Sequence, residues 1–364
     1  MLRKLLLGMV LVVLMGMSAS PAAAASDLNT GHGFYEEITY LLEQEILQGY
    51  PDDTVRPDAT VTRAEAAIMI GRMQGLDGTQ RDSGFSDVTA RQKASGFIAE
   101  AEEAGYINGY PDGTFRPYET ITRGDMAIIL SRVFVTPFAE DVAFTDISPM
   151  MEAYEPIGYI LGANITVGYP DNTFKPNLAV TRAQFSAFLA RGQEPKFKND
   201  ARIAGSYMKD MTKTYVYESA DGSTSTHQYE FVPYRINDEL PLGFVWTMTD
   251  ENGEHIDDYI ESETRDYYGI GFPYSEFYVE LVYPVETGKT FNVDSTFSPE
   301  HEITAVGVTV ETAYRTFTNA VEVTVADDPD FVEEPIKYYM VEGFGGVKTV
   351  DMDGTTISEL VDVR

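Results

Sequence analysis

The sequence contains no cysteine, and its basic residues are outnumbered by acidic ones, 26 to 58. Without cysteine the chain forms no disulfide, no zinc–thiolate site and no thiol nucleophile. The formal net charge of −32 argues against nucleic acid and anionic lipid as partners, because both present phosphates that an acidic surface repels. An anionic ligand would therefore need a local basic pocket.

Recognisable catalytic motifs are also absent. The segment "ETGKT" is no phosphate loop, because Tyr283 stands where the loop needs its first glycine. No Gly-x-Ser-x-Gly or His-Glu-x-x-His motif occurs. The sequence has four well-separated histidines, which are His32, His227, His255 and His301. It therefore predicts no catalytic residue, no metal site and no cofactor.

Long apolar runs are confined to the N-terminus. Arg3 and Lys4 precede the apolar stretch Leu5–Met17, and small residues follow up to Ala25. This order is typical of a signal peptide, and the stretch is short for a membrane-spanning helix. We predict a signal peptide over residues 1–25, an exported chain, and no membrane span after cleavage.

The next part of the chain repeats one phrase three times. "GYPDDTVRPDATVTRAEAAIMI", "GYPDGTFRPYETITRGDMAIIL" and "GYPDNTFKPNLAVTRAQFSAFL" begin at Gly49, Gly109 and Gly168. A period of about 60 residues indicates one supersecondary unit repeated three times. We assign the units to residues 26–80, 81–139 and 140–192.

Each unit is predicted to be helix, loop, helix. Gly105 and Asn164 suit a left-handed stop after the first helix, and Glu45 is a poorer stop in the first unit. A threonine followed three residues later by an acidic or amide residue predicts a capping box at the start of the second helix. The three pairs are Thr62 and Glu65, Thr122 and Asp125, and Thr181 and Gln184.

An arginine follows each capping threonine, at Arg63, Arg123 and Arg182. The helix dipole disfavours a cation there by up to about 1 kcal/mol. One explanation is a structural ion pair with a loop aspartate, which would be Asp52, Asp112 or Asp171. The other is a ligand carboxylate held by the guanidinium group, together with free backbone amides at the helix start.

These motifs resemble the S-layer homology (SLH) domain over about residues 26 to 192. The resemblance implies a pseudo-threefold helical trimer of repeats that binds anionic, often pyruvylated, secondary cell-wall polysaccharide between repeats. It also implies a secreted protein at the cell wall or S-layer surface of a Gram-positive-type bacterium, with other surface proteins as further partners. The implied glycan-binding residues are Arg63, Arg123 and Arg182, with Gly49, Gly109 and Gly168 and, from the second loop, Asp112 and Gly113.

The three units depart unequally from the family pattern. Val55 replaces a loop phenylalanine in the first unit, whereas the second unit has the most complete loop, "GYPDGTFRP". Gly113 in that loop would let the backbone approach a sugar closely. We therefore expect unequal binding, with Arg123 contributing most.

Beyond residue 192 the sequence pattern changes. Residues 193–204 are predicted to be a linker, and residues 205–364 alternate apolar and polar residues between turn signals such as "DENG" and "MDGT". This pattern predicts an all-β antiparallel domain, either a sandwich or a half-barrel. We interpret it as a displayed domain with a binding or structural role; the alternative is a wall-anchored enzyme that acts on glycan.

Overall fold

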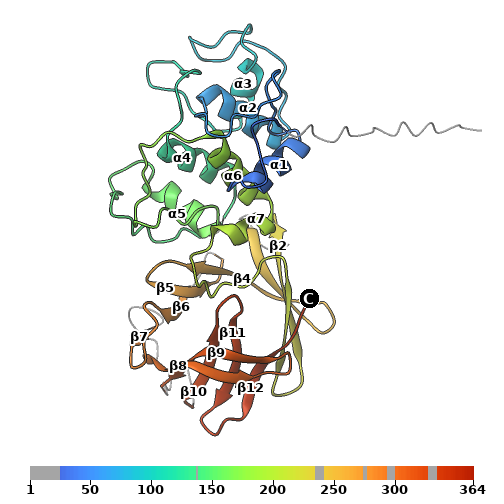
Figure 1. Cartoon of the computed structure of the whole chain (residues 1–364), viewed down its shortest axis with the longest axis vertical. Helices are drawn as coiled ribbons and strands as arrows, with labels where there is room; N and C mark the ends of the chain where they lie inside the picture. The colour runs from blue at the N-terminus through green and yellow to red at the C-terminus, as the bar shows by residue number, and fades with distance from the viewer. Residues whose placement is uncertain (1–24, 137, 234–241, 274–276, 293–299, 327–333) are drawn as a thin grey trace, which may run out of the picture.

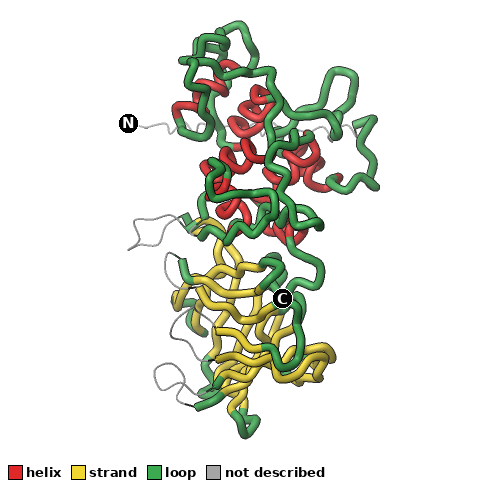
Figure 2. The backbone as a smooth tube through the Cα atoms, turned by 90° about the vertical axis from the view of Figure 1, so that its left-hand side faces the viewer, coloured by secondary structure: helices red, strands yellow, loops and turns green. Residues whose placement is uncertain are grey.

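The fold has a helical N-terminal half and an all-β C-terminal half, stacked along the long axis of the molecule (Figure 1). The computed structural model describes residues 25–136, 138–233, 242–273, 277–292, 300–326 and 334–364. The predicted signal peptide, except Ala25, lies outside the described residues. Figure 2 shows the same division, with helices gathered at one end and strands at the other.

The helical half contains two helices per unit, as the repeats predict. The bounds are α1 Tyr35–Glu43, α2 Arg63–Met73, α3 Ser95–Glu103, α4 Arg123–Val133, α5 Tyr154–Gly162 and α6 Arg182–Gln193. All three predicted capping boxes are present, including the one that ends in the shorter Asp125. The predicted stops are confirmed too, since Glu45, Gly105 and Asn164 have φ values of 58°, 76° and 54°.

One core joins the three units. The apolar stripes of α2, α4 and α6 are buried, as their helical spacing predicts. The apolar positions of the first helices, including Ile38, Ile98 and Ile157, belong to the same core. No unit therefore buries its apolar face alone, and the three fold as one body.

The units close into a ring through their second helices. Antiparallel bridges join Thr62 to Thr120, Thr122 to Ala179, and Thr60 to Thr181. The backbone amide of Arg63 donates to Glu119 O at 2.8 Å, and equivalent bonds join the second unit to the third and the third to the first. The expectation of free amides at these helix starts is therefore wrong, because carbonyls of the next unit already accept from them.

The C-terminal half is one antiparallel sheet. Its described residues form twelve strands in the order β6-β5-β4-β3-β2-β1-β12-β11-β10-β9-β8-β7. The bounds are β1 Thr214–Ser219, β2 Thr224–Val232, β3 Gly243–Asp250, β4 His255–Glu263, β5 Tyr267–Gly271, β6 Phe277–Val282, β7 Thr290–Asn292, β8 Glu300–Glu311, β9 Thr316–Val325, β10 Ile336–Val341, β11 Gly345–Asp351 and β12 Thr356–Val363. Among the described residues, each strand pairs with its sequence neighbours except β6 and β7, which stand at opposite ends of the order, and β1 pairs with β12.

This sheet curls into a nearly closed barrel (Figure 1). A single interior cluster gathers Tyr215, Trp246, Leu281 and Ile303 from strands far apart in the order. Because the described strands belong to one sheet, the two-sheet sandwich is not the form present. The antiparallel all-β prediction is confirmed, and the half-barrel comes closer to the observed closure.

The two halves are in contact. Between them lie the short helices α7, Pro195–Lys198, and η1, Asn199–Ala201, within the segment predicted to be a linker. Phe138 stacks on Phe277 with ring centroids 5.1 Å apart. A Cβ at Gly243 would lie 2.2 Å from Val135 O, so glycine is required where β3 begins.

Candidate functional site

Each arginine that follows a capping threonine reaches into the loop of the next unit. Arg63 contacts the loop of unit 2, Arg123 that of unit 3 and Arg182 that of unit 1. We name these contacts junction 1–2 (Arg63 with residues 108–115), junction 2–3 (Arg123 with residues 167–174) and junction 3–1 (Arg182 with residues 48–55). The threefold closure of the ring thus creates three equivalent positions from one sequence motif.

At junction 1–2 the Arg63 guanidinium is held by neutral groups. Its Nε donates to Phe115 O at 2.7 Å and its Nη2 to Asn108 O at 2.8 Å. The guanidinium also lies over the Tyr110 ring, 4.9 Å from the ring centre. A cavity of about 310 Å³ opens beside it, lined among others by Arg63, Gly109, Tyr110, Asp125 and Arg132.

Junction 2–3 holds its arginine by fewer bonds. Arg123 Nε donates to Phe174 O at 2.7 Å, and among the described residues no hydrogen-bond acceptor meets its terminal nitrogens. The loop differs here because Gly168 has φ +74°, whereas Gly49 and Gly109 are not in the left-handed region. Arg123 is 4% exposed, and this burial lowers the pKa of its guanidinium. The structure thus buries a cation whose charge no carboxylate within the described residues neutralises by direct contact.

Junction 3–1 differs in containing an ion pair. Arg182 donates to Val55 O at 2.7 Å and to Gln48 O at 3.1 Å, as Arg63 does to its own loop. Its Nη1 also lies 3.5 Å from Glu65 Oε1. This arginine is therefore already paired with a carboxylate of the protein.

The predicted ion pairs with loop aspartates are wrong. Asp52, Asp112 and Asp171 pair with the cation four residues later in their own loops, at 3.0, 3.0 and 3.2 Å. Hydrogen bonds from Thr114 and from Arg116 hold the pKa of Asp112 down to about 2. The loop aspartates thus stabilise their own turns and leave the junction arginines to other partners.

The predicted glycines divide between the junctions and the turn tips. Gly109 lines the cavity of junction 1–2, and a Cβ there would lie 2.8 Å from Thr114 O. Gly49 and Gly168 hold the same place at the other two junctions. Gly113 has φ +79° and lies beside Asp112 on the turn, outside the residues that line that cavity.

The sequence prediction paired Arg123 with the wrong loop. The complete loop "GYPDGTFRP" belongs to the same unit as Arg123, but in the structure it faces Arg63. Reasoning within one repeat could not detect a contact between repeats. It also missed Tyr50, Tyr110 and Tyr169, whose rings lie under the arginines; the signal was the tyrosine that follows the glycine in all three copies.

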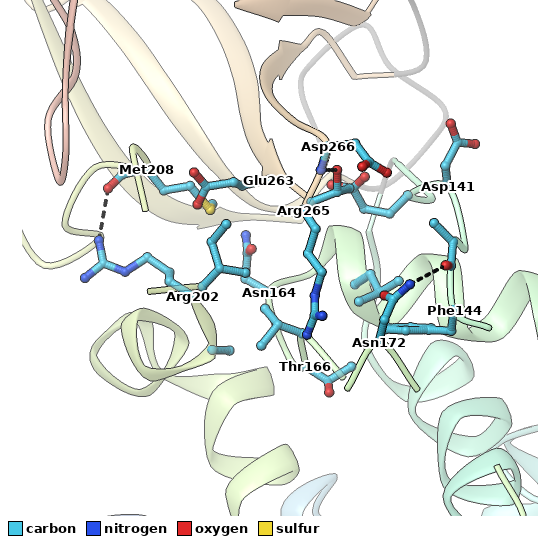
Figure 3. Close-up of a pocket in the computed structure, with 17 residues that line it drawn as sticks. Asp141, Phe144, Asn164, Thr166, Asn172, Arg202, Met208, Glu263, Arg265 and Asp266 are labelled. Carbon is cyan, nitrogen blue, oxygen red and sulfur yellow. Dashed lines mark hydrogen bonds between the residues drawn. The ribbon is translucent and has the colours of Figure 1, made fainter. Parts of the chain in front are cut away.

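The β half contacts junction 2–3. Arg265, between β4 and β5, donates to Tyr169 O at 2.5 Å and to Pro170 O at 3.0 Å. It borders an interdomain cavity of about 260 Å³, where Figure 3 shows its side chain pointing toward Thr166 and Asn172. Glu263 and Asp266 also line this cavity, yet the described residues contain no group of carboxylates and histidines arranged to hold a metal ion.

The comparisons with known proteins agree with this geometry. The pattern of the S-layer homology domain matches residues 26–67, 84–127 and 143–186. Residues 26–186 are three tandem S-layer homology domains. No helix in the described part of the chain has the length and apolar character needed to cross a bilayer.

Three relatives match about half of the chain or less. Cell surface glycoprotein 1 of Acetivibrio thermocellus is 36% identical over 162 residues, which is 41% of this chain and 7% of that protein. The cellulosome-anchoring protein of the same organism is 30% identical over 158 residues, 41% of this chain and 35% of that protein. An S-layer protein of Bacillus thuringiensis subsp. finitimus is 29% identical over 202 residues, which is 52% of this chain and 24% of that protein. The chain thus spans well under two thirds of each relative's length, and the repeats support a place at the cell surface.

Proposed function

We propose that the S-layer homology half attaches an exported protein to an anionic secondary cell-wall polysaccharide and displays the β half at the cell surface. One observation carries this proposal. Arg63 and Arg123 are buried cations that contact carbonyls and aromatic rings but, within the described residues, no carboxylate at ion-pair distance.

A buried guanidinium without a counter-ion is unfavourable in an empty site, and it favours an anion that can enter. A carboxylate, such as the pyruvate ketal of a wall sugar, can accept two parallel N–H bonds from the planar guanidinium group. The tyrosine ring below the arginine gives an apolar surface for the sugar. These features support an acidic saccharide as the ligand.

Two such junctions on one chain can engage one polymer. Binding at the second junction then occurs at a high effective concentration, so a modest affinity at each junction yields firm attachment. Since the net charge of the chain is −32, the local basic groups have to overcome a general repulsion of anions. The relatives named for anchoring and for the S-layer support this role.

The test is co-sedimentation of the chain from residue 26 to 364 with purified cell-wall sacculi. We expect binding to intact sacculi and none to sacculi stripped of secondary polysaccharide. The matched control is the double variant Arg63→Gln and Arg123→Gln, which should remain in the supernatant. Equal binding to stripped and intact sacculi would refute the polysaccharide as the target.

A further inference from the structure

The acidic or amide residue of the capping box, three residues after the threonine, lies near the arginine of the preceding unit in units 1 and 2. Glu65, which caps α2, lies 3.5 Å from Arg182 across junction 3–1. Asp125, which caps α4, lines the same cavity as Arg63 at junction 1–2. Gln184 holds this position in α6, on the unit that Arg123 contacts. The same position thus carries a long carboxylate, a short carboxylate and a neutral amide.

Glu65 uses its two oxygens for two purposes. Oε2 accepts from the backbone amide and the hydroxyl of Thr62, both at 2.9 Å, and so caps the helix. Oε1 meets Arg182 and also accepts from the Tyr50 hydroxyl at 3.1 Å. The Tyr50 bond fixes the carboxylate toward the arginine, so the ion pair is held in place.

The side chain of Asp125 is one methylene shorter than that of Glu65, and it only caps the helix. Its Oδ2 accepts from the Thr122 amide at 3.0 Å and from the Thr122 hydroxyl at 2.8 Å. Within the described residues it forms no ion pair with Arg63. Gln184 Oε1 accepts from the Thr181 amide at 3.2 Å, and its side chain carries no charge.

We propose that this capping residue determines which junctions accept an acidic sugar, and that Glu65 closes junction 3–1. This inference rests on the proposed anchoring function. A ligand carboxylate at junction 3–1 has to displace Glu65 from Arg182 or sit beside a second negative charge, and either is unfavourable. Asp125 and Glu152 line the cavity at junction 1–2, but within the described residues neither is at ion-pair distance from Arg63, and Arg123 has no such partner either. The arginines of junctions 1–2 and 2–3 thus stay unpaired, so the chain binds two saccharides and not three.

Two exchanges within the molecule test the proposal. Glu65→Gln gives unit 1 the residue that already caps unit 3, so the helix cap is preserved while the competing charge is removed. Gln184→Glu places the closing residue opposite Arg123. Glu65→Asp separates charge from reach: it keeps the charge at the length found in Asp125, which forms no ion pair with Arg63 within the described residues, so it should open junction 3–1 as Glu65→Gln does.

The measurement is calorimetric titration of the chain from residue 26 to 364 with a pyruvylated wall-glycan fragment, beside the same fragment with its pyruvate removed. We expect two sites in the wild type, three in Glu65→Gln, and about tenfold weaker binding at one site in Gln184→Glu. Thermal melting of each variant shows whether the cap has been preserved.

The outcomes separate the two proposals. Three sites in the wild type, or two unchanged sites in a folded Glu65→Gln variant, would overturn the closing role of Glu65. If Arg63→Gln and Arg123→Gln also bind the pyruvylated fragment like the wild type, the anchoring function itself fails. If those two variants lose binding while Glu65→Gln changes nothing, only the inference about Glu65 is lost.

Discussion

Lys209 in the β half and the arginines of junctions 1–2 and 2–3 in the helical half are buried in opposite ways. In the β half, Lys209 Nζ lies 2.7 Å from Glu261 Oε1, and Tyr268 donates to the same oxygen at 2.8 Å. In the helical half, Arg63 and Arg123 contact neutral carbonyls and rings instead. Burial alone would lower the pKa of Lys209, but Glu261 raises it well above its ordinary value. The compensated charge of Lys209 stabilises the fold, whereas the unpaired charges of Arg63 and Arg123 support our proposal of a ligand at these two junctions.

The largest expected loss of stability follows from breaking the Lys209–Glu261 pair. Lys209→Met leaves Glu261 buried without its partner, which should lower the free energy of unfolding by about 3–5 kcal/mol. The measurement is chemical denaturation of the chain from residue 26 to 364. The control is Lys337→Met, whose partly exposed pair with Glu322 at 3.2 Å should contribute about 1 kcal/mol or less. Equal losses in both variants would mean that the interior pair has no special role.

A second prediction concerns the boundary between the halves. Glu140 is buried, accepts from the Tyr267 hydroxyl at 3.2 Å and lies near Asp141 and Glu263. Burial raises the pKa of Glu140 from 4.5 to about 8, so the folded chain binds a proton that the unfolded chain has released. Stability therefore falls as pH rises from about 4.5 to 8.

The variant Glu140→Gln should remove this dependence of stability on pH. At pH 7 the variant should be more stable than the wild type by on the order of 2 kcal/mol, and less so at pH 5. The matched control is Asp141→Asn at the exposed neighbour, which should follow the wild type. Lys198 opposes the trend only at higher pH, because burial lowers its pKa to about 7. A Glu140→Gln profile parallel to the wild type between pH 5 and 7 would contradict the assignment.

The smallest expected loss of stability concerns the capping threonines that directly precede the junction arginines. Thr122 accepts from the Asp125 amide at 3.1 Å, so Thr122→Ala should cost about 1 kcal/mol of stability. Ser131→Ala in the same helix is the control, since Ser131 donates only to Ile128 O of its own helix and should be nearly neutral. Thermal melting compares the two. A neutral Thr122→Ala would show that the next unit alone fixes the helix start.

Local sequence patterns predicted the helical half well. The capping threonines, the left-handed stops and the apolar stripes depend on residues within one turn or one helix of each other. Contacts between units were not predictable in this way, because the spacing inside one repeat does not say which loop closes on Arg63. The prediction that Arg123 contributes most stays open, but its support is now the neutral Gln184 and not the loop of its own unit.

The sequence predicted that the C-terminal half is all-β and antiparallel, but it did not predict how far the sheet closes. Alternation identifies strands and their inward faces, and it is the same in a sandwich and in a rolled sheet. What distinguishes them here is the pairing of β1 with β12, which joins the strands β1 to β6 and the strands β7 to β12 into one sheet. The hydrogen bond from Arg265 to Tyr169 O could not be predicted either, because the sequence around an exposed arginine in a turn does not indicate its partner.

The comparison among the three junctions can be decided by calorimetric titration. Arg63→Gln, Arg123→Gln and Arg182→Gln, each in the chain from residue 26 to 364, would be titrated with a pyruvylated wall-glycan fragment beside thermal melts. We expect at least about tenfold weaker binding at the affected site for Arg63→Gln and Arg123→Gln, with the larger loss for Arg123→Gln. Arg182→Gln should bind within about twofold of the wild type, because Glu65 already occupies that arginine. Equal losses in all three variants, or unchanged binding in all three, would contradict uncompensated arginines as the basis of wall attachment.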